Sequence, residues 1–142
     1  MRNNHGELLA AGAGKINYAA SALHTEAMAT YKGLLFASQW GMPCIILETD
    51  ASVLASVLNA NGIDRSGVGG LIRQAQQIMR FEFSSCVISN CSRCCNKVAD
   101  ALATYGVCML SFDTELLTSQ SLEFVSEFVA DDFASMLCLM NM

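Results

Sequence analysis

The chain has 142 residues, of which 53% are hydrophobic and 15% charged, a composition that fits one folded domain and excludes general disorder. No apolar run reaches the ~18 residues that a membrane helix needs, and residues 1–6 are polar, unlike a secretory signal. We therefore expect an intracellular protein, of the nucleus or the cytoplasm, with no membrane partner. The formal net charge is −5, but residues 1–112 carry eight basic and seven acidic residues, so the charge of the body neither supports nor excludes nucleic-acid binding.

The first half of the chain alternates between strand and helix patterns. Residues 7–16 are typical of a hairpin, with two short strands around a glycine-containing turn. Apolar residues then follow helical spacing over residues 22–40, where Ser21 or Thr25 can serve as the N-cap. Residues 44–47 form a short, fully apolar run, which is typical of a buried parallel strand.

The second half continues this alternation up to residue 105. Its patterns predict helices and one further strand, the helices over 51–59, 68–80 and 96–105 and the strand over 81–88. Strands that alternate with helices after an opening hairpin indicate an α/β layered domain. The fold class predicted from the sequence is therefore α/β, with helices that flank a mixed sheet.

The end of the chain differs in composition from the body. From Asp113 onward there are six acidic residues and no Lys or Arg. Starting at Leu116, an amphipathic helix is expected, with four apolar residues along one side: Leu122, Val125, Val129 and Met136. We predict a domain over residues 1–110 and an acidic amphipathic tail over residues 111–142.

Three carboxylates stand out by their positions in these elements. Glu26 lies in the first turns of the first helix, Asp50 follows the apolar strand, and Asp100 lies one turn into the last helix of the body. Carboxylates that converge at strand and helix ends can hold Mg²⁺. Each also has a simpler interpretation: Asp50 as the N-cap of the next helix, Glu26 and Asp100 as solvated helix charges.

The seven cysteines are expected to be mostly reduced in an intracellular chain. Cys91 and Cys94 form a C-x-x-C with Cys95 beside them, which could be half of a zinc site. A second pair of ligands with similar spacing does not accompany it in the sequence. Buried or loop thiols are therefore the preferred interpretation, with neither zinc nor a structural disulfide expected.

The motifs resemble the ribonuclease H-like domain of plant reverse-transcriptase-derived (retroelement) proteins, in family order and at family spacing over residues 4–106. The matching segments are Asn4-His-Gly-Glu-Leu-Leu-Ala-Ala-Gly, Thr25-Glu26-Ala27 with Lys32-Gly33-Leu34 and Ala37, Glu48-Thr49-Asp50-Ala51, and Asn96-Lys97-Val98-Ala99-Asp100-Ala101-Leu102-Ala103. The last segment is the most specific. The resemblance implies a ribonuclease H-like fold and a hydrolase that cleaves the RNA strand of an RNA–DNA hybrid with two Mg²⁺ ions.

The resemblance also assigns the site and sets its limits. Glu26, Asp50 and Asp100 match three of the family's four acidic metal ligands. The family's first, central strand carries the remaining Asp and precedes the segment at Met1, so we expect a truncated domain that is weakly active or inactive. The loop before the last helix carries no His, which some ribonucleases H use in catalysis. The alternative is a non-catalytic remnant or scaffold whose acidic C-terminal helix binds a protein partner.

Overall fold

The computed structural model describes residues 1–60, 62, 65–108, 115–117, 128–129 and 132. The chain divides into two compact units, residues 18–91 and residues 1–17 with 92–142. Within the described residues the protein has the predicted α/β composition, consistent with a ribonuclease H-like fold. No described helix is long and apolar enough to cross a membrane.

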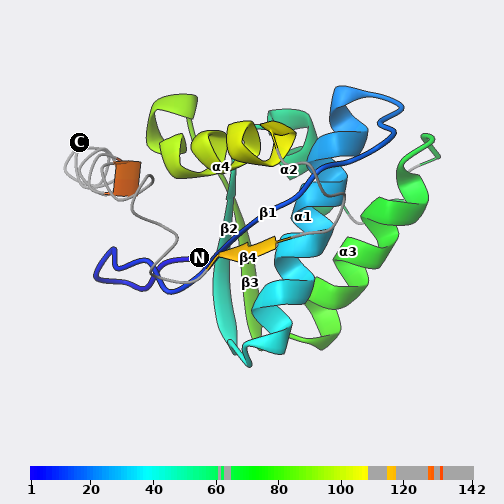
Figure 1. Ribbon diagram of the computed structural model, residues 1–142. Coiled ribbons are helices and arrows are strands. Elements are labelled where there is room, and N and C mark those ends of the chain that lie inside the picture. Colours follow the sequence, from blue (N-terminus) through cyan, green and yellow to red (C-terminus); the bar gives the residue numbers. More distant parts are fainter. Residues whose placement is uncertain (61, 63–64, 109–114, 118–127, 130–131, 133–142) are drawn as a thin grey trace. The chain divides into compact units, whose positions relative to one another are not determined.

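The unit of residues 18–91 is built on a parallel pair of strands. Strands β2 (Cys44–Thr49) and β3 (Ser85–Asn90) lie side by side with Ile45 opposite Cys86 (Figure 1). The predicted parallel pairing is confirmed, although β3 begins later than expected because Phe81 ends the preceding helix. The apolar run of β2 is less buried than expected, since Ile46 is 69% exposed.

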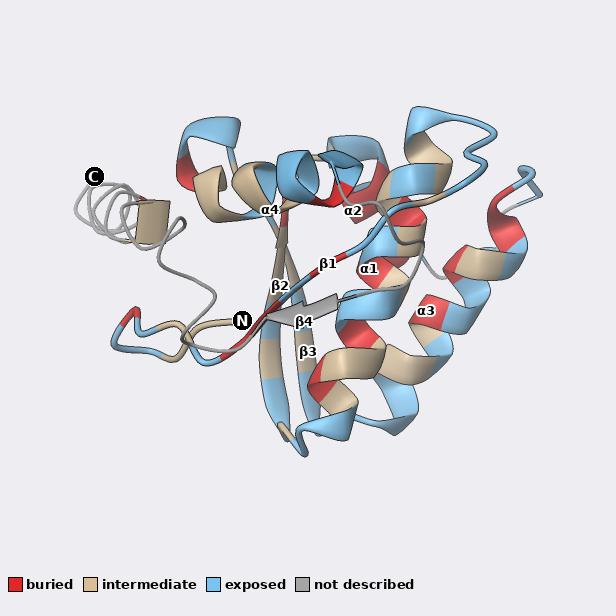
Figure 2. Ribbon diagram, viewed as in Figure 1, coloured by how far each residue is buried: buried red, intermediate tan, exposed pale blue. Residues whose placement is uncertain are grey.

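Three helices complete this unit: α1 (Ala22–Gln39), α2 (Ser52–Asn59) and α3 (Gly69–Phe81). Helix α1 packs against α3, while α2 and α3 both contact β3. Buried positions recur at helical spacing along these helices, as Figure 2 shows, and Leu34, Leu54 and Ile72 are their most deeply buried large side chains. The amphipathic patterns therefore predicted all three helices to within a residue or two, because each pattern reports the face that the helix buries.

Local signals set the limits of helix α1. Ser21 is its N-cap, with its hydroxyl oxygen accepting a hydrogen bond from the backbone N–H of His24 at 3.1 Å. This side chain occupies one of the donors that the first turn of a helix leaves without a partner. The helix ends before Gly41, whose φ of 67° lies in the left-handed region that glycine tolerates best.

The other unit is organised around strand β1 (Ala11–Ala13) and helix α4 (Lys97–Cys108). Strand β1 pairs antiparallel with β4 (Glu115–Leu117), and α4 packs against β1. The predicted hairpin over residues 7–16 is wrong in its pairing: β1 takes its partner from the far end of the chain. An isolated antiparallel bridge, Arg2 with Leu8, closes the segment before β1.

A small apolar cluster holds this second unit together. Ala11 is 3% exposed, and five partly buried apolar side chains pack against it: Leu8, Val98, Ala101, Leu102 and Phe128. Phe128 comes from the segment that we interpreted as an acidic tail. The helix expected to start at Leu116 does not start there, because Leu116 lies in β4. Of its predicted apolar side, Leu122, Val125 and Met136 lie outside the described residues.

Candidate functional site

Asp50 stands directly after β2, at the carboxyl end of the parallel strand pair. Its side chain is half-buried. The N-cap of α2 is Ala51, and no side chain caps this helix, so the interpretation of Asp50 as an N-cap is wrong. The turn is fixed by Thr49 instead, whose hydroxyl oxygen accepts a hydrogen bond from the backbone N–H of Ala51 at 3.1 Å. Asp50 therefore has the location at a strand end where α/β domains gather ligand-binding groups.

Glu26 lies in the first half of helix α1, at the border of its buried face. The side chain is half-buried, while Ala27 beside it is only 1% exposed and Thr30, one turn further on, is 8% exposed. Glu26 and Asp50 thus belong to the same unit, one on a helix and one after a strand. Their half-burial distinguishes both from fully solvated surface carboxylates.

Asp100 lies in the first turn of helix α4, in the other unit of the chain. Its side chain is exposed, and its backbone N–H donates to the carbonyl oxygen of Asn96 at 3.1 Å. The helix therefore starts where the sequence predicted. The convergence of Asp100 with Glu26 and Asp50 stays a prediction.

The chemistry of the three carboxylates suits a hard cation. Mg²⁺ prefers oxygen ligands, and ionised carboxylates supply them. In the described part of the chain, no group of three or more His, Cys, Asp or Glu side chains is assembled as a metal site. Binding of Mg²⁺ by these three residues stays a prediction.

Sequence reasoning missed a residue that positions helix α4. Asp132 is 3% exposed, and its carboxylate accepts hydrogen bonds from the backbone N–H groups of Lys97 and Val98 at 2.9 and 3.0 Å. The only signal in the sequence was an acidic residue in a segment rich in acids. These two hydrogen bonds connect Asp132 to the helix that carries Asp100.

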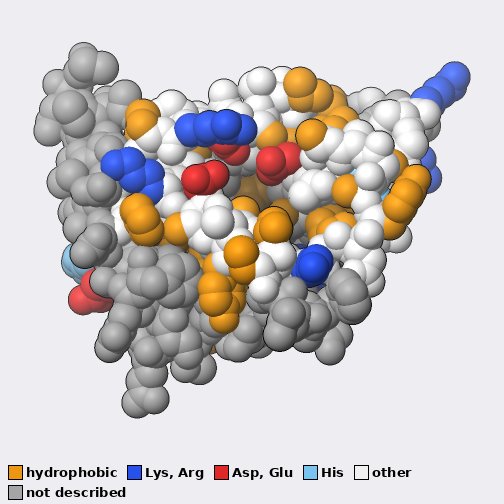
Figure 3. Space-filling view, turned by 45° about the horizontal axis from the view of Figure 1, so that its top comes forward, with side chains coloured by type: hydrophobic (Ala, Val, Ile, Leu, Met, Phe, Trp, Pro, Cys, Tyr) orange, Lys and Arg blue, Asp and Glu red, His pale blue; other side chains and the backbone are white. Residues whose placement is uncertain are grey.

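The surface charge of the described residues is mixed. On the face drawn in Figure 3, side chains of both signs lie among apolar side chains. Binding to a nucleic acid would then depend on a few local contacts and on bound cations, since a near-neutral body supplies little long-range attraction to phosphates.

The α/β fold agrees with the family comparison. The model of the family described as "Reverse transcriptase-like" matches residues 1–106, and the chain therefore belongs to this family. The matched region is ribonuclease H-like and contains Glu26, Asp50 and Asp100. Comparisons with the curated proteins and with the solved structures find no significant match.

Proposed function

We propose that this chain binds RNA–DNA hybrids, with Glu26, Asp50 and Asp100 as the acidic residues that hold Mg²⁺ beside the RNA strand. The observation that carries the proposal is the family match over residues 1–106, which includes all three carboxylates. On the resemblance of residues 96–103, the proposal also includes an origin of this chain in plant retroelements.

The local structure of two of these residues supports the proposal. Asp50 follows a strand of a parallel pair and is not occupied as a helix cap. Asp100 lies on a helix whose first N–H groups are held by a buried carboxylate from residue 132. A side chain at a strand end, or on an anchored helix, keeps its position better than a side chain on a loop.

The charge of the carboxylates predicts how binding depends on cations. Three anionic side chains repel the phosphates of a hybrid until a cation lies between them. Mg²⁺, when bound, neutralises this charge and polarises the scissile phosphodiester. Binding should therefore require Mg²⁺ more than ordinary backbone contacts do, while cleavage of the RNA strand by residues 1–142 is weak or absent.

The proposal is tested by fluorescence anisotropy with one labelled sequence prepared as RNA–DNA hybrid, duplex DNA and duplex RNA. At low salt, the full chain should bind the hybrid most tightly, and EDTA should weaken this binding several-fold. Asp50→Asn should lose the Mg²⁺-dependent part, whereas Glu82→Gln should keep it, since Glu82 is an exposed carboxylate at the end of α3. Equal affinity for all three duplexes, unchanged by EDTA, would contradict the proposal.

A further inference from the structure

A cluster of three side chains at the short helix η1 (Arg93–Cys95) has no part in the proposed function. The Oγ atom of Ser92 lies 2.7 Å from Sγ of Cys94 and 3.4 Å from Sγ of Cys95. The two sulfur atoms are 3.7 Å apart. Cys94 is exposed and Cys95 is buried, so a reagent in solution reaches Cys94 first.

The geometry of this cluster favours the thiolate form of Cys94. A thiolate only accepts hydrogen bonds, so the Ser92 hydroxyl and the Cys95 thiol donate to it. The hydrogen bond from Ser92 is the largest cause that lowers the pKa of Cys94, followed by the hydrogen bond with Cys95 and, more weakly, the charge of Lys97. Among the described residues, further charged groups near the cluster are Arg93 in η1, Asp100 and the carboxylate of Asp132. A thiolate is the nucleophilic form of cysteine.

We propose that Cys94 is a thiol-modification site that reacts with low-molecular-weight disulfides, with Ser92 and Cys95 as its positioning residues. The Cys94 thiolate attacks one sulfur of a disulfide RS–SR. A Cys94–SR bond forms as the RS–SR bond breaks, and the released thiolate takes up the proton that Cys94 lost. The small disulfide is the oxidant, and it is reduced to one bound and one free RS group.

Cys95 is a poor resolving group for this mixed disulfide. Adjacent Cα atoms are about 3.8 Å apart across a trans peptide, below the roughly 4.4–6.8 Å usual for disulfides. The described residues contain no cis peptide bond that would change the geometry of the Cys94–Cys95 pair. Cys95 should therefore not displace the adduct from Cys94. This inference is independent of nucleic-acid binding.

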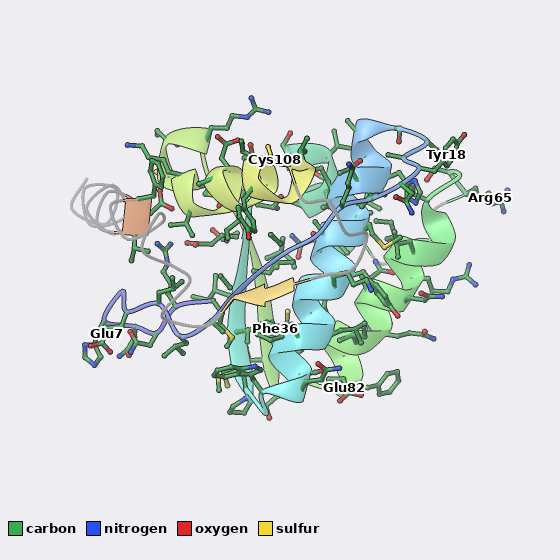
Figure 4. The ribbon with its side chains drawn as sticks, in the orientation of Figure 1. Glu7, Tyr18, Phe36, Arg65, Glu82 and Cys108 are labelled. Carbon is green, nitrogen blue, oxygen red and sulfur yellow. The ribbon has the colours of Figure 1, made fainter. Side chains whose placement is uncertain are left out.

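The probe is oxidised glutathione, added to the reduced full chain and followed by intact-protein mass spectrometry and peptide mapping. The first adduct should form on Cys94, about tenfold faster than on Cys44 or Cys108, which are also exposed. Cys108, labelled in Figure 4, is the last residue of helix α4. Cys94→Ser should abolish the fast adduct, whereas Cys108→Ser should leave it unchanged.

The role of Ser92 is tested by the pH profile of the same reaction. Ser92→Ala should move the midpoint of the Cys94 rate profile to higher pH and slow the reaction several-fold near neutrality. Ser92→Thr, which keeps the hydroxyl, should restore the midpoint, and this rescue separates thiolate stabilisation from a general loss of structure. A first adduct on another cysteine, or a midpoint that Ser92→Ala leaves in place, would overturn the proposal.

Discussion

The carboxylate of Asp132 joins the start of helix α4 to a distant part of the chain: one oxygen accepts from the N–H of Lys97 at 2.9 Å, the other from the N–H of Val98 at 3.0 Å. The first N–H groups of a helix have no partner within the helix, and its N-terminus carries a partial positive charge. A buried carboxylate accepts hydrogen bonds from these N–H groups, and its negative charge is favourable at this end of the helix. Residue 132 is therefore part of the packing of this unit.

Removal of this carboxylate should destabilise the unit. Asp132→Asn keeps the size of the side chain, but one acceptor oxygen becomes an NH₂ group that faces a backbone donor. We expect a loss of about 1–2 kcal/mol in the free energy of unfolding, measured with urea. Glu82→Gln removes an equal charge from an exposed position, shown in Figure 4, and should change little. Equal effects of the two variants on the free energy of unfolding would show that the loss of charge, and not the loss of a hydrogen bond to α4, causes the change.

The contrast between Ser21 and Asp132 explains which parts of the structure were predictable. Ser21 caps its helix by accepting from the N–H of a residue three positions later, so the local sequence suffices to predict this cap. Asp132 caps a helix 35 residues earlier, and no local pattern encodes that partner. The hairpin predicted over residues 7–16 failed for the same reason, since periodicity predicts elements but not a long-range partner such as β4 for β1.

The sequence predicted the candidate site only in part. Residue types and motif order placed Glu26, Asp50 and Asp100 correctly on their elements, while their joint role as a site stays a prediction. The N-cap interpretation of Asp50 failed because Thr49 organises the turn before α2. The cluster of Ser92, Cys94 and Cys95 was visible as a cysteine motif, but its hydrogen bonds depend on the turn of η1.

Gly106 on α4 should not tolerate a side chain. A Cβ atom at this position would lie 2.8 Å from the carbonyl oxygen of Gly14, a backbone atom that cannot move aside easily. Gly106→Ala should therefore cost about 1–3 kcal/mol of stability. Gly33 on α1 is the matched control, because nothing lies within 4 Å of its Cβ position. Gly33→Ala should stabilise the protein by about 0.5–1 kcal/mol, and thermal melts that rank the two variants otherwise would contradict this account.

Gln76 on α3 stabilises the end of helix α2. Its Nε2 group donates to the carbonyl oxygens of Val57, Leu58 and Ala60 at 3.2, 3.3 and 3.0 Å. The last carbonyls of a helix lack the usual partner four residues further on, although Val57 also accepts from the backbone N–H of Ala60 at 3.2 Å. Gln76→Ala should cost about 1 kcal/mol, and hydrogen exchange should accelerate in α2.

Two further variants at this contact sharpen the test. Gln77 is exposed on the same helix, so Gln77→Ala should leave the exchange of α2 unchanged. Gln76→Glu places a carboxylate, which only accepts, against the same carbonyl oxygens and should destabilise more than Gln76→Ala at neutral pH. Its pKa should rise in the folded state, so the lost stability should return as the pH falls and the carboxyl is protonated. A stability that decreases on acidification would refute this assignment of donors.

The last prediction concerns cleavage. Two-metal hydrolysis requires ligands that hold both ions about 4 Å apart around the scissile phosphate. Residues 1–142 supply three carboxylates at the positions that the family resemblance assigns, and Mg²⁺ tolerates incomplete octahedral geometry poorly. We expect little or no Mg²⁺-dependent cleavage of a labelled RNA–DNA hybrid by this chain on a denaturing gel. Any weak cleavage that remains should be lost in Asp50→Asn and kept in Glu82→Gln. Strong cleavage by residues 1–142 alone, lost in Asp50→Asn and in EDTA, would show that three carboxylates suffice.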